Sequence, residues 1–190
     1  MRALLIVDMQ NDFMPGGSLA VPDAELLIPG INAMIGKFKH VIASQDWHPK
    51  QHSSFKSNSS EGIWPEHCVQ DSYGAEFAPG LDQVQFSKVI QKGMNPQIDS
   101  YSAFFDNDHK SQTGLDSHLK ERGIDELYIC GVATDYCVKW SVLDALELGY
   151  QVYLIQDLCA GINLQNDDCK KAFNEMHSSG AKIVQSSEID

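Results

Sequence analysis

Residues 127–155 have the sequence LYICGVATDYCVKWSVLDALELGYQVYLI, which indicates the architecture of the whole chain. The apolar runs at its two ends, 127–130 and 152–155, are typical of strands that are covered on both faces. Between them, residues 135–148 have the spacing of an amphipathic helix, and Gly149 ends it just before the second strand. A strand, a helix and a strand in this order predict a right-handed crossover between two parallel strands.

The same alternation extends over the rest of the chain. Further strands are predicted at Ala3–Val7, Val41–Ser44, Lys88–Gln91 and Ala181–Val184, and further helices at Leu26–Phe38, Leu115–Glu121 and Asp167–Ser178. We therefore predict one α/β domain over residues 1–190, with three layers (α/β/α) around a mostly parallel six-stranded sheet. In such sheets, ligands bind at the carboxyl ends of the strands.

Two long segments interrupt this rhythm, Asp46–Gly80 and Met94–Thr113. Irregular segments of this length inside a domain are usually functional loops or disordered. The aromatic residues in the first segment favour packed loops.

Charge and cysteine usage limit the partners and the compartment. The chain has 14 Lys and Arg against 26 Asp and Glu, a net charge of -12, which repels phosphate backbones and anionic lipids. We expect no nucleic-acid or membrane partner. The apolar run at Ala3–Val7 is too short for a signal peptide, and no segment reaches the ~20 apolar residues of a membrane span. The five cysteines are an odd number without CxxC spacing, which indicates reduced thiols and a cytoplasmic location.

Three polar residues follow predicted strands: Asp8, Lys92 and Cys137. With Thr134 as the cap, Cys137 falls in the first turn of a helix, where the backbone amides favour a thiolate. Lys92 would lower the pKa of the thiol further, and Asp8 could exchange a proton with the sulfur, an arrangement that suits acyl transfer from an amide. Taken singly, Cys137 is equally well an ordinary buried cysteine, Asp8 a helix or loop cap, and Lys92 a surface amine. Their common placement at strand ends favours the catalytic interpretation.

The small residues of GVAT before Cys137 allow the amides of Ala133 and Cys137 to form an oxyanion hole, although steric need at the turn would also explain them. Phe13, Trp64 and Tyr101 lie in loops on the same side and could sandwich a flat ring. Loop aromatics also serve as local core, and spacing does not distinguish the two roles.

A second constellation comprises Asp46, His48 and His67, with His52 between the two histidines. One carboxylate and two imidazoles would bind a cation and leave positions open, as catalytic metal sites do. The alternative is that these histidines are solvated in a long polar loop or form hydrogen bonds with the backbone. Cys68, Glu61 and Glu66 leave the exact ligand set open. The other histidines, to which we assign no role, are His40, His109, His118 and His177.

Five ordered motifs carry a family resemblance: DMQNDFMPGGSLAV (8–21), SQDWHPKQHSSF (44–55), WPEHCVQ (64–70), KGMNPQIDSYSAFFDN (92–107) and GVATDYCV (131–138). Together they closely resemble the bacterial nicotinamidases (pyrazinamidases) of the isochorismatase-like cysteine hydrolase superfamily. The likeness extends from Ala3 to about Gly161.

The resemblance implies hydrolysis of nicotinamide to nicotinate and ammonia, a reaction of NAD salvage. It also implies that pyrazinamide is hydrolysed in the same way. It makes Asp8, Lys92 and Cys137 the catalytic triad, with a thioester on Cys137. It also assigns one divalent metal ion, zinc before iron or manganese, and a set of binding residues. These are Asp46, His48 and His67 for the metal, Phe13, Trp64 and Tyr101 for the ring, and a cis Val132–Ala133 bond that shapes the substrate pocket and the oxyanion hole. His52 occupies a position that is a ligand only in some members, and members range from monomers to larger assemblies.

Two departures from the family pattern concern the pocket walls. Tyr136 stands where some relatives have histidine, and the segment between Phe55 and Trp64 is shorter than in several of them. The alternatives to a nicotinamidase are another amidase or isochorismatase-type hydrolase and a non-catalytic metal-binding or redox-sensing protein. A further alternative is an enzyme in which a metal-bound water attacks the substrate directly and the thiol is not the nucleophile.

Overall fold

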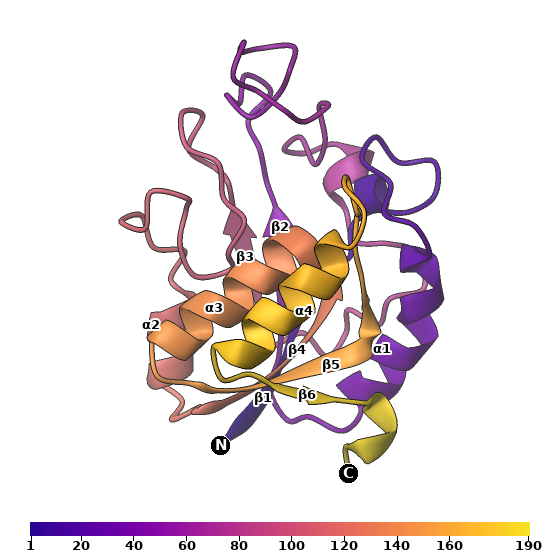
Figure 1. Ribbon diagram of the computed structural model, residues 1–190, viewed down its shortest axis with the longest axis vertical. Coiled ribbons are helices and arrows are strands. Elements are labelled where there is room, and N and C mark those ends of the chain that lie inside the picture. Colours follow the sequence, from indigo (N-terminus) through magenta and orange to yellow (C-terminus); the bar gives the residue numbers. More distant parts are fainter.

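The computed structural model describes residues 1–190 and contains one open sheet of six parallel strands (Figure 1). The strands are β1 (Arg2–Val7), β2 (Val41–Asp46), β3 (Lys88–Lys92), β4 (Glu126–Val132), β5 (Gln151–Ala160) and β6 (Lys182–Val184). Their order is β3-β2-β1-β4-β5-β6, so the chain begins in the centre, winds to one edge and then to the other. The winding reverses between β1 and β4, which is where a doubly wound sheet opens a crevice for ligands.

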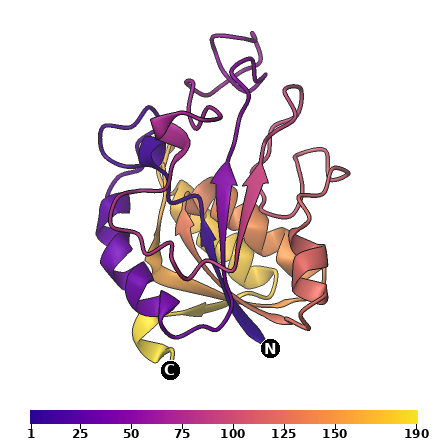
Figure 2. The ribbon, with the colours of Figure 1, turned by 180° about the vertical axis from the view of Figure 1, so that it is seen from behind.

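Four helices cover the two faces of the sheet: α1 (Ile28–Ile35), α2 (Leu115–Lys120), α3 (Lys139–Glu147) and α4 (Asp168–Ser178). Side chains of β1 alternate between the two cores, since Leu4 and Ile6 pack with α1 whereas Leu5 and Val7 pack with the other three helices. Figure 1 shows α3 and α4 in front of the sheet, and Figure 2 shows the opposite face with α1. The predicted three-layer α/β/α domain with six strands is confirmed, and its sheet is parallel throughout.

The strands run further than their apolar cores. β2 continues through Gln45 and Asp46, and β3 through Lys92, although these side chains are polar. Gln45 donates to the Ala75 carbonyl at 3.1 Å, and Asp46 lies opposite Lys92 in the register of the two strands. Tertiary partners therefore satisfy polar groups that end an apolar run in the sequence.

Two predicted helices differ in their first turns. The segment predicted at Leu26–Phe38 begins with a 3-10 turn, Ala24–Leu27, before α1, and the one predicted at 135–148 begins with a π turn, Thr134–Val138, before α3. Thr134 is not the cap, contrary to our expectation. The capping residue is Ala133, which is extended and has no side-chain acceptor, and its carbonyl accepts from the amides of Tyr136 and Val138 at 3.0 and 3.1 Å.

The two long loops gather beyond the carboxyl ends of β2 and β3, above the arrowheads in Figure 2. Their only helical turn is the 3-10 turn Tyr73–Ala75. The sheet thus places both loops over one edge, next to the crevice. None of the helices combines the length and the apolar character that a membrane crossing requires.

Candidate active site and metal centre

Asp8 is the first residue after β1 and has a left-handed backbone conformation, with φ 49°. Its side chain is fully buried, and its Oδ1 accepts from the Ser44 hydroxyl at 2.6 Å. The other oxygen, Oδ2, forms an ion pair with Lys92, whose Nζ lies 3.0 Å away, and accepts from no further group. Ser44 therefore fixes the carboxylate while Oδ2 keeps a free lone pair for a proton.

Lys92 ends β3 and is buried among oxygen and sulfur atoms. Its Nζ contacts both Asp8 and Asp46, donates to the Ser100 carbonyl at 2.9 Å and lies 3.4 Å from Cys137 Sγ. Burial alone would lower the pKa of Lys92, but the charges of Asp46 and then Asp8 raise it well above its usual value. The group is therefore a fixed positive charge beside the sulfur.

Cys137 lies in the π turn after β4, and an oxygen of Asp8, an oxygen of Asp46 and its Sγ all lie within 4.8 Å of one another. Burial raises the pKa of this thiol well above its usual value, and Lys92 only partly opposes it. Contrary to our expectation, this arrangement does not favour the thiolate, because desolvation of the buried thiol exceeds the effect of Lys92. Burial also raises the pKa of Asp8, which makes this carboxylate a stronger base.

The peptide bond between Val132 and Ala133 is cis, as the resemblance implies. Ala133 lines the cavity at Cys137, whereas the side chain of Val132 is buried in the core with α1. The amide of Cys137 lies between those of Tyr136 and Val138 and, unlike them, does not donate to the Ala133 carbonyl. The amides of Ala133 and Cys137 as an oxyanion hole stay a prediction.

A cavity of about 20 Å³ opens beside Cys137, and Phe13, Trp64 and Tyr101 all line it. Trp64 Nε1 donates to the Tyr101 hydroxyl at 3.2 Å, and the rings of Trp64 and Tyr136 meet edge to face with centroids 4.9 Å apart. We call Trp64, Tyr101 and Tyr136 the aromatic triplet. The structure thus brings the three predicted aromatic residues to the predicted nucleophile, and the triplet leaves little free volume in the cavity.

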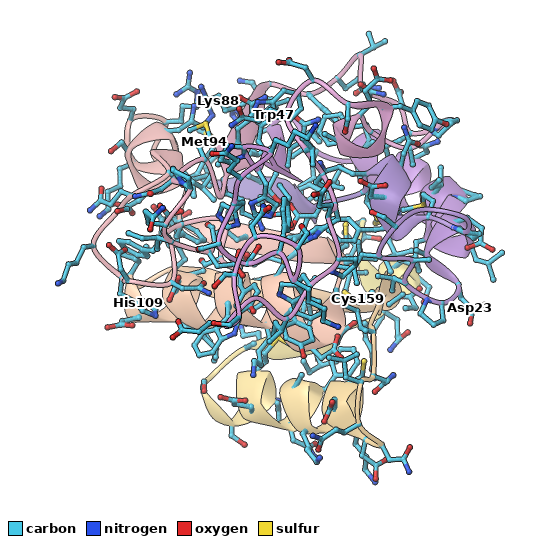
Figure 3. The ribbon with its side chains drawn as sticks, turned by 90° about the horizontal axis from the view of Figure 1, so that it is seen from above. Asp23, Trp47, Lys88, Met94, His109 and Cys159 are labelled. Atoms are coloured by element: carbon cyan, nitrogen blue, oxygen red, sulfur yellow. The ribbon has the colours of Figure 1, made fainter.

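The three predicted metal ligands, Asp46, His48 and His67, also converge. Figure 3 looks down on this end of the sheet, where Trp47 and Met94 mark the points at which β2 and β3 end. Asp46 Oδ2 lies 3.6 Å from His48 Nε2 and 3.8 Å from His67 Nε2, beyond hydrogen-bond distance. Burial alone would raise the pKa of Asp46, but Lys92 and then His48 hold it well below its usual value, so the carboxylate is ionised.

This donor set fits a divalent metal ion. Ligands about 2.1 Å from a tetrahedral zinc ion are separated by roughly 3.4 Å, close to the observed spacing. The Nδ1 atom of His48 lies 3.0 Å from the Gly93 carbonyl, and that of His67 lies 2.9 Å from the Pro65 carbonyl. Donation from Nδ1 to these carbonyls leaves the lone pair of each Nε2 facing the shared space, which is the usual support of a metal-binding histidine.

His52 belongs to a second grouping, with His48 and Asp99, but its own ring nitrogens have partners. Nδ1 lies 2.7 Å from the Ser54 hydroxyl and Nε2 lies 3.2 Å from the Ile98 carbonyl. The remaining candidates lie outside both groupings: Glu61 and Glu66 are exposed, and Cys68 is buried with its sulfur 3.9 Å from the Gly74 carbonyl.

Comparison with known proteins identifies the family. The profile of the isochorismatase domain matches residues 2–188. The chain belongs to the isochorismatase family. Within this family it is 48% identical to the nicotinamidase of Escherichia coli (strain K12), over 96% of this chain and 93% of that protein.

Two solved structures of the family support the same assignment. A nicotinamidase/pyrazinamidase of Acinetobacter baumanii is 43% identical, covers 100% of this chain and 98% of its own, and superposes with a TM-score of 0.96. A pyrazinamidase of Pyrococcus horikoshii in complex with zinc is 44% identical, covers 97% and 98%, and has a TM-score of 0.86. The family predicted from the five motifs is confirmed.

Several residues of the site in this isochorismatase-family chain were not predicted from the sequence. Gln10 is buried, and its side chain bonds both the amide and the carbonyl of Asp46 at 2.8 Å. Ser44 holds Asp8, as described above, and the carbonyl of Ser100 holds Lys92. Three further residues line the cavity: Leu19, Asp99 and Ile162. The polar Gln10 so soon after β1 was a usable signal, but the other positions have no local pattern.

Proposed function

We propose that the protein is a nicotinamidase, which hydrolyses nicotinamide and pyrazinamide to the acid and ammonia through a thioester on Cys137. The observation that carries this proposal is the convergence of Cys137, Lys92 and Asp8 beside an aromatic cavity and a metal-donor set. The near full-length likeness to nicotinamidases of other organisms supports the substrate. The enzyme belongs among cysteine amidohydrolases that contain a metal ion.

The reaction begins with transfer of the thiol proton from Cys137 to Oδ2 of Asp8, since Ser44 already occupies Oδ1. The sulfur then attacks the carboxamide carbon while Lys92 stabilises the negative charge beside it. The amides of Ala133 and Cys137 bind the oxyanion, and Asp8 returns its proton to the nitrogen as ammonia leaves. Water hydrolyses the thioester, with Asp8 as the base.

Positioning of the ring is the second part of the mechanism. Phe13, Trp64 and Tyr101 enclose a flat ring, and this holds the carboxamide against the sulfur. Asp46, His48 and His67 would hold a zinc, iron or manganese ion, which when bound supplies a Lewis-acid contact for the ring nitrogen. The carbonyls of Gly93 and Pro65 keep both imidazoles oriented for that ion.

We place this activity in NAD salvage in the cytoplasm. All five cysteines are free thiols, and free thiols persist in a reducing compartment. The acidic net charge of -12 disfavours nucleic acid and membranes as partners, so the partner is the small-molecule substrate. A homo-oligomer is compatible with this function and is left open.

Ammonia release tests the proposal. The metal-loaded protein is assayed with nicotinamide and with propionamide, and then after chelation. We expect turnover of nicotinamide, little of the aliphatic amide, and loss of activity with the chelator. Cys137→Ala should remain folded, because losing one small wall residue leaves little cavity, and should lose all turnover. Activity that survives this substitution would support metal-bound water as the nucleophile and refute the thioester.

A further inference from the structure

A second cavity, of about 180 Å³, lies between the 101–109 segment and α3. Its walls include Tyr101, Phe105, Asp106, His109, Trp140 and Asp144. His109, labelled in Figure 3, marks the outer side of this loop, and its ring centroid lies 6.2 Å from that of Trp140 on α3. The cavity is slightly larger than the ~150 Å³ that accommodates a benzene molecule in a protein core.

Asp144 contributes a buried carboxylate to this cavity. Its side chain is only 3% exposed; the Ser102 hydroxyl in the same wall lies near the carboxyl, but no group donates to Oδ2 within hydrogen-bond geometry. Its Oδ1 lies 3.7 Å from His109 Nδ1, too far for a hydrogen bond. Buried carboxylate oxygens almost always have partners, and an unpaired one costs free energy. A ligand with N–H donors would satisfy this oxygen.

The walls around Asp144 are aromatic. The rings of Phe105 and Trp140 each lie 6.2 Å from His109 by centroid, on opposite elements. Aromatic faces attract cations, tryptophan most strongly. Lys139 already lies over Trp140, with Nζ 5.0 Å from the ring centroid, but it is paired with Glu175 at 3.5 Å and does not line the cavity.

A second acid, Asp106, adds negative charge to the lining. Asp106, His109 and Asp144 do not bring three ligand atoms within 4.8 Å of one another, unlike the groups at the metal centre. The geometry therefore disfavours an inorganic divalent cation and favours a cation with an apolar body.

We propose that this cavity binds a small organic ammonium ion of about benzene size, with its N–H groups on Asp144 and its hydrocarbon against the aromatic walls that Phe105 and Trp140 contribute. The site is separate from the cavity at Cys137, although Tyr101 belongs to the walls of both. The inference does not depend on the proposed hydrolysis of nicotinamide.

The test is a titration with benzylammonium, followed by amide chemical shifts in NMR spectra of the full chain. Benzyl alcohol, of the same shape without the charge, is the matched ligand control. The key variant is Asp144→Asn, which removes a buried charge and keeps the shape. Glu147→Gln makes the same charge change on an exposed residue of the same helix. Each titration is repeated with excess nicotinate, the product, which the enzyme does not consume, because an aromatic ligand also suits the cavity at Cys137.

We expect benzylammonium to bind the wild type and Glu147→Gln at millimolar concentrations and to shift amides around Asp144. Binding to Asp144→Asn should be about tenfold weaker or more, as expected for the loss of a charged hydrogen bond. Benzyl alcohol should bind the wild type about as weakly as benzylammonium binds Asp144→Asn. Thermal unfolding shows whether Asp144→Asn is folded, and Trp140→Leu provides a second variant with weakened binding.

Three results would overturn the proposal: equal binding by Asp144→Asn, complete displacement by nicotinate, or no binding by the wild type. A crystal structure of the soaked protein with only water at Asp144 Oδ2 would do the same.

Discussion

Lys92 holds together two carboxylates that would otherwise repel each other in a buried site. Asp8 and Asp46 both contact its ammonium, and neither carboxylate can be solvated. Removing one member of a buried ion network leaves uncompensated charge, which costs more than the network contributes. The same ammonium lies beside the sulfur of Cys137, so at this residue stability and chemistry depend on one charge.

We therefore predict that Lys92→Met lowers the free energy of unfolding by about 3–5 kcal/mol and abolishes turnover. Asp8→Asn keeps the pair of Lys92 with Asp46, so it should destabilise the fold less, while kcat falls by roughly 10² to 10⁴ because the general base is lost. Urea unfolding and ammonia release measure the two quantities. If Asp8→Asn retains normal kcat, Asp8 is not the base. If Lys92→Met unfolds at the wild-type urea midpoint, the charge network is not stabilising.

The metal ligands give a second prediction at this scale. His67→Gln should reduce bound metal, measured by elemental analysis after dialysis, from about one ion per chain to a small fraction, since three ligands are needed for tight binding. His52→Gln is the matched control and should keep the ion, because both nitrogens of His52 have protein partners. Loss of metal from both variants would place His52 among the ligands.

Individual site residues were predictable where they follow a strand. Asp8, Lys92 and Cys137 meet because parallel strands end at one edge of the sheet. Ser44 was not predictable, since its role depends on a partner across the sheet rather than on neighbours in sequence. The raised pKa of the Cys137 thiol was missed for a similar reason: burial, its largest cause, is a tertiary property.

At the scale of elements, β1 and β4 approach each other closely where the site begins. Gly131 on β4 has φ 116°, and a Cβ atom there would collide with the backbone of Val7, the residue before Asp8. Only glycine allows both the conformation and the approach. Because Gly131 has no side chain, β1 and β4 can lie this close together. Their approach sets the relative positions of Asp8, which follows β1, and of Cys137, in the turn after β4.

We predict that Gly131→Ala destabilises the fold by about 2–4 kcal/mol, from backbone strain together with overpacking, and lowers kcat by shifting Asp8. Gly149→Ala is the control, since Gly149 has φ 90° with no atom within 4 Å of the added Cβ. It should cost only about 1 kcal/mol, from the conformation alone, and leave kcat unchanged. Urea unfolding of both variants makes the comparison. Equal losses would show that the approach of the strands is not the cause.

Periodicity in the sequence located the strands and helices but not their irregular ends. The apolar spacing at 135–148 predicted a helix, yet its first turn is a π turn, because the Ala133 carbonyl accepts from both Tyr136 and Val138. The strand β2 was predicted two residues short, since Gln45 and Asp46 are polar and buried only through partners in other segments.

Over the whole molecule, the site is assembled from segments far apart in sequence. The alternation of strands and helices predicted the class of fold and the edge at which ligands bind. It did not predict the order β3-β2-β1-β4-β5-β6, because strand neighbours are set by long-range packing. The two long loops meet there, and they contribute Trp64 and Tyr101 to the aromatic triplet, while the turn after β4 contributes Tyr136.

This assembly leaves too little free volume beside Cys137 for the aromatic ring of the substrate. The free volume is about 20 Å³, whereas a protein cavity of roughly 150 Å³ is known to hold one benzene molecule. The loops must therefore separate before nicotinamide binds and again before nicotinate leaves. The hydrogen bond from Trp64 to Tyr101 joins the two loops in the closed form, so it contributes to the barrier in both directions.

Tyr101→Phe removes this bond and keeps the ring. A typical hydrogen bond contributes about 1 kcal/mol, so we expect the association and dissociation rate constants of nicotinate each to rise by up to about fivefold. The dissociation constant should change by less than about twofold, because the bond is present before and after binding. Stopped-flow tryptophan fluorescence on a Cys137→Ala background measures both rates without turnover. Tyr136→Phe is the control, since the Tyr136 hydroxyl makes no hydrogen bond to another residue, and its rates should match the parent. A rise in the dissociation rate alone would show that the bond forms only in the complex, and the loops would then close over the ligand rather than open to admit it.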